Sequence, residues 1–189
     1  MKSLLKTKLN QSVIFLFFIC LFTACKNDDD NPPQNPIDQL PPMTQTGEQT
    51  FGCLINGEPF IPPSFGSNAP NAFYQFVDGA YTLGISARNN SSIGLQSIII
   101  GGIDIVNINE ITYDLESFSI GNLYGLYDLV LDENSETYYT NENYPGTLTI
   151  TNFDNQNFII SGTFEFIVLD DDGNEINITD GRFDLNFTN

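Results

Sequence analysis

The sequence contains neither histidine nor tryptophan, and its 189 residues include only six lysines and arginines against 24 aspartates and glutamates. The absence of histidine excludes Ser-His and Cys-His nucleophile systems and every zinc site with a histidine ligand. The G-x-S-x-G nucleophile elbow and the G-x-x-x-x-G-K-S/T phosphate loop are absent as well. We therefore expect the protein not to be an enzyme. The one enzyme class left open is a hydrolase that uses a pair of carboxylates.

Half of the few basic residues precede a short apolar run at the start of the chain. Three lysines are followed by the run Val13 to Phe22, which ends in Thr23-Ala24-Cys25. An apolar run of this length is too short to cross a membrane as a helix, which takes roughly 20 residues. The pattern predicts a lipoprotein signal peptide over residues 1–24, cleaved before Cys25, which then carries the lipid.

The segment that follows Cys25 is polar and acidic. It begins Lys26-Asn27-Asp28-Asp29-Asp30, and five prolines lie between Lys26 and Gln49. Such a composition buries too little apolar surface to offset chain entropy, so residues 25–49 are expected to form a lipidated, disordered spacer. The start of the segment resembles the export signal of Bacteroidota lipoproteins. The resemblance implies lipid anchoring in the outer membrane, with display at the cell surface.

Cleavage at this site would change both the charge and the cysteine content. The remaining chain would keep three basic residues against 24 acidic ones, a formal charge of −21. That charge excludes nucleic acid as a partner and leaves the lipid anchor as the expected contact with the membrane. Because Cys20 is removed and Cys25 is lipidated, Cys53 has no partner for an intrachain disulfide. It alternates with Phe51 and Ile55, which predicts a buried, inert thiol.

Residues 50–189 are expected to form one β-rich domain. Apolar and polar residues alternate with a period of two, for example at Leu83, Ile85 and Ala87, at Leu148 and Ile150, and at Phe183, Leu185 and Phe187. The segment Phe158 to Leu169 is apolar on both faces, which indicates a central strand. Turns are expected at 77–80, 88–92, 154–157 and 170–174. The pattern predicts an all-β fold, an antiparallel β-sandwich or a partly open β-barrel of roughly nine or ten strands.

Three segments near the end of the domain carry a family resemblance. They are Gly146-Thr147-Leu148-Thr149-Ile150-Thr151, Ser161-Gly162-Thr163-Phe164-Glu165-Phe166 and Ile178-Thr179-Asp180-Gly181-Arg182-Phe183-Asp184. Together with Phe51 to Phe60, they resemble an uncharacterised family of Bacteroidota lipoproteins that have a signal peptide, a tether and one β-rich domain. The resemblance implies the location and the fold class, and it implies no activity and no site.

Two sets of residues are candidates for binding an ion. Asp170, Asp172 and Asn174 lie in the densest acidic segment, and their oxygens could contribute ligands to calcium. The spacing does not match an EF-hand loop, and a plain hairpin turn with solvated acids is the alternative. No other cofactor is expected. Arg182 lies between Asp180 and Asp184 at two-residue spacing, so it could anchor a ligand carboxylate or phosphate or simply pair with the two acids.

Tyrosines interleaved with asparagines form the third candidate. Tyr124, Tyr127, Tyr138 and Tyr139 lie close together in the sequence, and aromatic rings beside amides suit sugar binding. The alternative divides these tyrosines between core faces and a loop. The expected function is a non-catalytic binding or accessory module at the cell surface, for a glycan or an outer-membrane protein partner. A structural or adhesion protein of the envelope is the alternative, and the carboxylate-pair hydrolase is a minor one.

Overall fold

The computed structural model describes residues 35–131 and 134–189. Within these ranges the fold is all-β, with one short 3-10 helix, η2 (Pro36–Gln39), and no α-helix. The predicted signal peptide and Cys25 lie outside the described residues. No helix in the described ranges is long and apolar enough to cross a membrane.

Eleven strands follow η2 along the chain. They are β1 (Thr50–Ile55), β2 (Glu58–Phe60), β3 (Asn71–Val77), β4 (Ala80–Ser91), β5 (Gly94–Ile105), β6 (Thr112–Leu115), β7 (Leu123–Leu131), β8 (Asn134–Tyr139), β9 (Gly146–Asp154), β10 (Ile159–Leu169) and β11 (Glu175–Thr188). The all-β prediction is confirmed, whereas the predicted count of nine or ten strands is too low.

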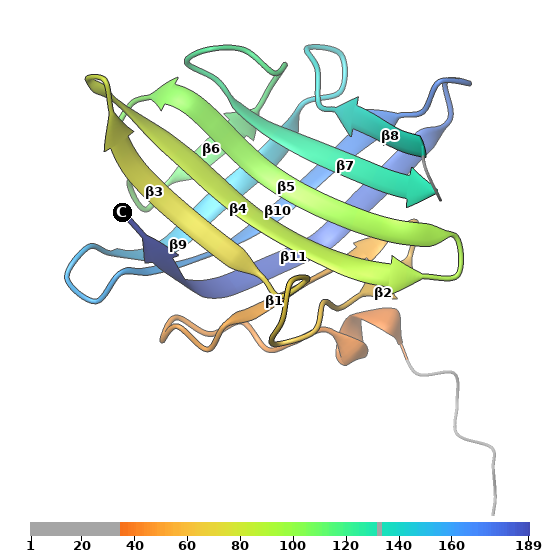
Figure 1. The fold of residues 1–189 in the computed structure, drawn as a ribbon, viewed down its shortest axis with the longest axis horizontal. Coiled ribbons are helices and arrows are strands. Elements are labelled where there is room, and N and C mark those ends of the chain that lie inside the picture. The colour runs from red at the N-terminus through yellow and green to blue at the C-terminus, as the bar shows by residue number, and fades with distance from the viewer. Residues whose placement is uncertain (1–34, 132–133) are drawn as a thin grey trace, which may run out of the picture. The chain divides into compact units, whose positions relative to one another are not determined.

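All eleven strands belong to one open, mixed sheet. Its order is β6-β9-β10-β11-β3-β4-β5-β7-β8, and β1 pairs with both β11 and β2. Figure 1 shows the sheet folded over itself, so that β3, β4, β5, β7 and β8 form one layer and β6, β9, β10 and β11 form the other. Most of β11 pairs antiparallel with β10, but Phe187 and Thr188 pair with β3 in parallel. A wholly antiparallel arrangement is therefore wrong at this one junction, where the two layers join.

The alternating segments place their apolar residues between the two layers, as expected. Leu83, Ile85 and Ala87 of β4 are buried, and so are Leu148 and Ile150 of β9. Strand β10 lies between β9 and β11, so the prediction of a central strand is confirmed. The period-two pattern thus identified these strands and their core-facing sides correctly.

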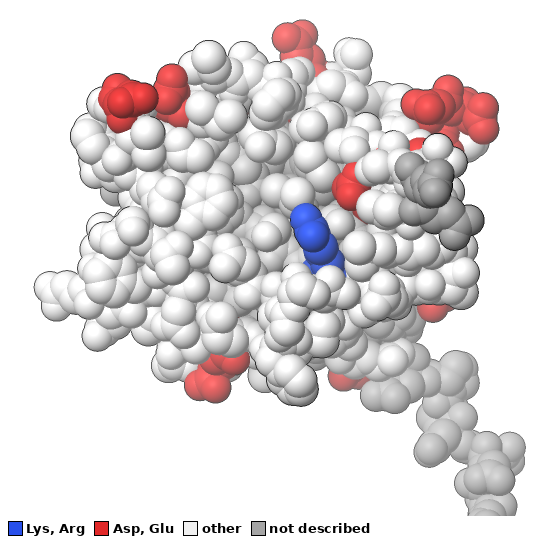
Figure 2. Space-filling model, in the orientation of Figure 1, with Lys and Arg blue, Asp and Glu red and all other residues white. Residues whose placement is uncertain are grey.

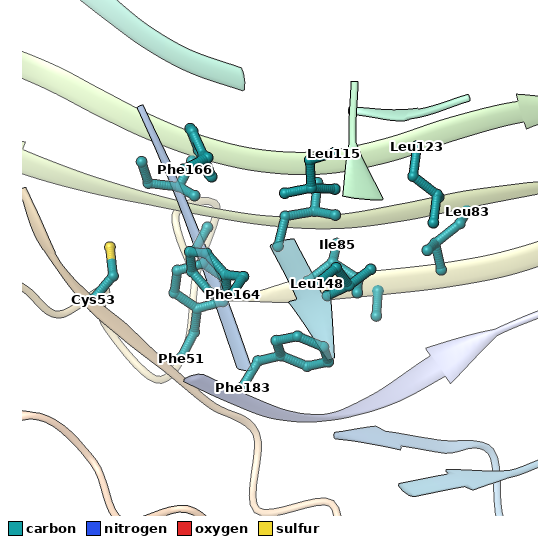
Figure 3. Close-up of a cluster of buried hydrophobic side chains, with 14 of the residues drawn as sticks. Phe51, Cys53, Leu83, Ile85, Leu115, Leu123, Leu148, Phe164, Phe166 and Phe183 are labelled. Carbon is teal, nitrogen blue, oxygen red and sulfur yellow. The ribbon is translucent and has the colours of Figure 1, made fainter. Parts of the chain in front are cut away.

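Phenylalanine supplies much of the bulk of the core, as Figure 3 shows. The ring of Phe164 lies 5.3 Å from that of Phe51, 6.3 Å from Phe166 and 6.4 Å from Phe183, measured between centroids. Across the β10–β11 pair, Phe164 faces Gly181, where a Cβ would lie 2.5 Å from the phenylalanine ring. A chain without tryptophan thus fills its core with rings packed against one another and over glycine.

Most of the predicted turns occur where the sequence placed them. Asp78 and Gly79 both have positive φ, and Val77 pairs with Ala80, so β3 and β4 form a two-residue hairpin. The turn predicted at 88–92 is wrong, because β4 continues to Ser91. The connection there is Ser92–Ile93, held by the Ser91 hydroxyl, which donates to the carbonyl of Gly94 at 2.9 Å.

Residues 35–49, which we call the strap, are packed on the sheet. The side chain of Leu40 is buried, and the Pro41 ring lies 2.7 Å from where a Cβ of Gly52 would be. The compact unit of the structure accordingly begins at Asn35. The prediction of a disordered spacer does not hold for residues 35–49, and residues 25–34 of that spacer lie outside the described residues.

One buried carboxylate holds the strap. Five groups donate hydrogen bonds of 2.7 to 3.1 Å to the Asp184 carboxylate: the hydroxyls of Thr44 and Ser161 and the backbone amides of Thr46, Gly47 and Glu48. Burial alone would raise the pKa of Asp184, but these hydrogen bonds outweigh burial and lower it to about 2. Asp184 lies on the polar side of the alternation in β11, yet it is only 1% exposed because the strap covers it.

Cys53 is fully buried in β1, as its alternation with Phe51 and Ile55 predicted. Burial raises the pKa of its thiol well above the usual value. Because the thiolate is the reactive species, the thiol is inert in the folded domain.

Candidate functional site

The structure divides the four candidate tyrosines into two pairs. Tyr127 is only 2% exposed and belongs to the core, and Tyr138, its cross-strand neighbour on β8, packs against the same core. Tyr124 and Tyr139 alternate with these core residues and therefore point to the opposite side of the layer. The structure thus agrees in part with the alternative that divides these tyrosines, because Tyr127 and Tyr138 belong to the core, whereas Tyr124 and Tyr139 share a surface.

A third ring joins this outward pair. Phe118, in the connection between β6 and β7, lies 4.8 Å from Tyr124 and 5.2 Å from Tyr139, measured between ring centroids. Tyr124 and Tyr139 are themselves 5.9 Å apart. Phe118 is 52% exposed and Tyr139 is 37% exposed, so the cluster presents ring surface to solvent. We call these three residues the aromatic trio.

Glycines on the neighbouring strands allow aromatic rings to lie against the sheet. A Cβ at Gly101 of β5 would lie 2.5 Å from the hydroxyl oxygen of Tyr124. On the neighbouring strand β4, the ring of Phe73 occupies the position that a Cβ of Gly84 would take. Both glycines lie inside strands, a position where glycine often marks close approach of another group.

The surface around these rings carries almost no charge. We call the side of β3, β4, β5, β7 and β8 that points away from the core the outer face. Its side chains include Phe73, Gln75, Thr82, Ser86, Arg88, Ile99, Tyr124, Leu126, Asp128, Thr137 and Tyr139. Of this set only Arg88 and Asp128 are charged. Figure 2 shows the face as largely uncharged, with one basic side chain near its centre and most acids towards its margins.

Two polar groups of the outer face, the Asp128 carboxylate and the Tyr124 hydroxyl, differ in how they can bind a ligand. Asp128 accepts hydrogen bonds of 2.7 Å from the hydroxyls of Ser135 and Thr137, so part of its charge is already satisfied. Partial burial, and secondarily the nearby Tyr139, raises the pKa of Tyr124 above its ordinary value. Tyr124 therefore keeps its proton at neutral pH and remains a hydrogen-bond donor.

Arg182 lies apart from the aromatic trio, on β11 in the other layer. It lines a cavity of about 380 Å³ together with Met43, Glu165 and Asp180. Its Nε donates to the backbone carbonyl of Asp180 at 3.2 Å, and Asp184, its expected second partner, is committed to the strap. The tyrosines and Arg182 thus do not form one site, and the acids beside Arg182 make this cavity unfavourable for an anion.

The acidic segment forms the hairpin turn between β10 and β11. The Asp170 carboxylate accepts hydrogen bonds from the backbone amides of Asp172 and Asn174 and from the Asn174 side chain. These bonds, that from the Asn174 side chain foremost, lower the pKa of Asp170. The Asn174 side chain directs its nitrogen, not its oxygen, towards Asp170. In the described ranges, no group of three acidic, cysteine or histidine side chains is placed to hold a metal. The geometry therefore does not support a calcium site.

The inward tyrosines line a cavity of about 510 Å³ at one end of the fold, and the residues Asp170 and Asp172 lie at the same cavity. The Tyr127 hydroxyl accepts a 2.9 Å hydrogen bond from Gln96, and the Tyr138 hydroxyl donates to Glu136 at 3.2 Å. Burial, and then Glu136, raises the pKa of Tyr138. The acids would repel an anionic ligand here, and both tyrosine hydroxyls already have protein partners.

Sequence reasoning missed Phe73, Phe118 and the two glycines. Phe118 is an isolated aromatic residue in the serine-containing loop Glu116-Ser117-Phe118-Ser119, close in sequence to the tyrosines, and that position was a usable signal. Phe73 gave no comparable signal, because only the pairing of β3 with β4 places it on the same face.

Comparison with known proteins adds no further constraint on the site. The chain matches no protein-family model, no curated protein and no solved structure. The resemblance to Bacteroidota lipoproteins therefore stays a prediction, and the geometry of the outer face is the ground on which a function can be proposed.

Proposed function

We propose that this protein is a non-catalytic binding module that holds a glycan on its outer face. The observation that carries the proposal is the aromatic trio, whose exposed rings lie on an almost uncharged sheet surface. Sugar rings have apolar faces that stack on aromatic rings, while their hydroxyls need hydrogen-bond partners. Gln75, Thr82 and Ser86 offer such partners on the same face.

The charge distribution favours a neutral glycan. The chain carries a formal net charge of −18, which disfavours the approach of anionic ligands. A cationic partner would need a cluster of acidic side chains. Among the outer-face residues named above, Asp128 is the one acidic residue. Neither sign of charge is therefore selected there, and ring stacking and hydrogen bonding are the remaining sources of affinity.

The predicted location at the outer membrane is consistent with such a role. Lipid attachment at Cys25 would place the domain on the outer membrane, with residues 25–34 ahead of the strap, and display at the cell surface would let the outer face meet external glycans. We infer that the folded-over sheet acts as a partly open barrel rather than as a sandwich, since one continuous sheet provides both layers. Either description leaves the outer face free of other described elements.

Replacing Tyr139 with alanine should weaken glycan binding about tenfold, the equivalent of about 1.4 kcal/mol, because the exposed ring is lost while the strand pairing is kept. The measurement is a glycan array with the full chain, followed by affinity electrophoresis in each polysaccharide that binds. The matched control is Phe158→Ala, which removes an aromatic ring of similar exposure, 40%, at the β9–β10 turn.

Equal binding by Tyr139→Ala and wild type would remove the support for a glycan site at the trio. A structural or adhesion role would then be favoured if the protein still captured an envelope protein through another surface. Release of shorter sugars from a bound polysaccharide would instead indicate the carboxylate-pair hydrolase.

A further inference from the structure

We propose that the ligand is a neutral, linear oligosaccharide that runs across the strands, from Phe73 on β3 to Tyr124 on β7. This inference rests on the proposed glycan function and names the class and direction of the ligand. It follows from the register of four neighbouring strands, from the glycines within them and from the charge of the face.

The strand register places four residues in one row on the outer face. Phe73 pairs with Gly84, Gly84 pairs with Gly101, and Gly101 pairs with Tyr124. The two aromatic residues are thus the ends of a row whose middle positions are both glycine. We call these four residues the glycine row.

The glycines let the two rings turn inward along the row. The Phe73 ring lies over Gly84 and the Tyr124 ring lies over Gly101, each in the space that a Cβ would need. Glycine weakens the interior of a strand, so two adjacent glycines at the centres of β4 and β5 are a poor choice for a sheet that serves only to cover a core. The rings of Phe73 and Tyr124 therefore cover the neighbouring strands, and no side chain stands between them. We call the surface of these two rings the aromatic floor.

The length of the row sets the size of the ligand. Phe73 and Tyr124 are separated by three interstrand steps of about 4.8 Å, so the row spans roughly 14 Å. That distance exceeds the width of one sugar ring and matches a short chain of sugars. Beyond Tyr124 the surface continues onto Phe118 and Tyr139, with Tyr139 one strand further along on β8.

The chemistry beside the row selects a neutral, unbranched chain. Thr82 and Ser86 lie on β4 two residues either side of Gly84, and Gln75 pairs with Thr82 on β3. Hydroxyl and amide groups therefore flank the two rings and can form hydrogen bonds with the hydroxyls of a bound sugar. A linear chain can keep its ring faces on the floor along its length, whereas a branch would lift part of the chain from the rings.

Calorimetric titration of the full chain tests the inference. The ligands are glucose, xylose and mannose, each as the single sugar and as linear β-1,4-linked chains of three and six units. We expect the affinity for the best-bound series to rise at least tenfold from one unit to six. The variant Phe73→Leu keeps an apolar side chain over Gly84 and removes only the ring, so it should abolish most of this gain. Phe158→Leu is the matched control, and thermal melting of each variant confirms that it folds.

Equal affinity for one and six units would overturn the inference, as would unchanged six-unit binding by Phe73→Leu. If Tyr139→Ala loses binding in either case, the proposed glycan function stands and only the path across the strands fails. If no sugar of the panel binds and the array is also blank, both the function and the path are contradicted.

Discussion

Replacing Asp184 with asparagine should lower the free energy of unfolding by about 3 kcal/mol, because hydrogen bonds to a buried charged group are strong and costly to leave unmade. The carboxylate accepts two hydroxyl and three amide hydrogens. An asparagine side chain would turn an NH₂ group towards some of these donors. Urea denaturation of both chains gives the measurement.

The matched control is Asp180→Asn, four residues earlier on the same strand. Asp180 is exposed at a bulge with positive φ, and its backbone carbonyl accepts a hydrogen bond from Arg182. The same chemical change should therefore cost less than about 0.5 kcal/mol there. If the two substitutions cost the same, the strap does not depend on the Asp184 carboxylate.

The stabilisation by Asp184 should also depend on pH in a defined window. Its folded pKa, about 2, lies below the ordinary value of 3.8, so the folded state holds the ionised form more strongly. The contribution, about 2 kcal/mol, is fully present above pH of about 4 and is lost as the pH falls towards 2. The difference in unfolding free energy between wild type and Asp184→Asn should shrink across this range. A difference that stays constant would mean that the carboxylate's charge is not its source.

Replacing Phe164 with alanine should cost about 3–5 kcal/mol of unfolding free energy, the range for removing a buried aromatic ring. The ring packs between Phe51, Phe166 and Phe183 and over Gly181. These neighbours belong to β1, β10 and β11, and the pairing of these strands fixes their positions. They therefore cannot all move in to fill the space, and a cavity remains.

Phe158→Ala makes the same chemical change at an exposed position and should cost less than about 1 kcal/mol. Both variants are compared with wild type by urea denaturation. Since a loss of this size is a large share of the stability of a typical domain, Phe164→Leu serves as a milder step if the alanine variant does not fold. A cost for Phe164→Ala close to that of Phe158→Ala would show that the core closes around the gap.

Local patterns were sufficient to predict the all-β class, several of the strands and most of the turns. Alternation identified the buried residues of β4 and β9, and the Asp78-Gly79 pair identified a hairpin. The same alternation placed Asp184 on the polar face, but it gave no sign that this residue is buried. The face is correct, but a segment 136 or more residues away covers it, and no local pattern reports such a contact.

For the candidate site, one signal in the sequence was missed, and one association could not be predicted from the sequence. Tyr138 and Tyr139 are adjacent in a strand, so period-two geometry already required them to point to opposite sides. The same rule separates Tyr124 from Tyr127. The association of Phe73 with Tyr124, by contrast, depends on how four strands pair, and register between distant segments cannot be read from one of them.

The junction made by β11 also governs how the chain can fold. This last strand is the partner of β10, β1 and β3, so the strands at the two ends of the domain meet on it. Strand β1 pairs with residues more than a hundred positions later. Contacts this distant in sequence raise the contact order and slow the search for the native topology. Strands β1 and β3 therefore each keep one edge unpaired until β11 pairs with them, and unpaired edges favour aggregation.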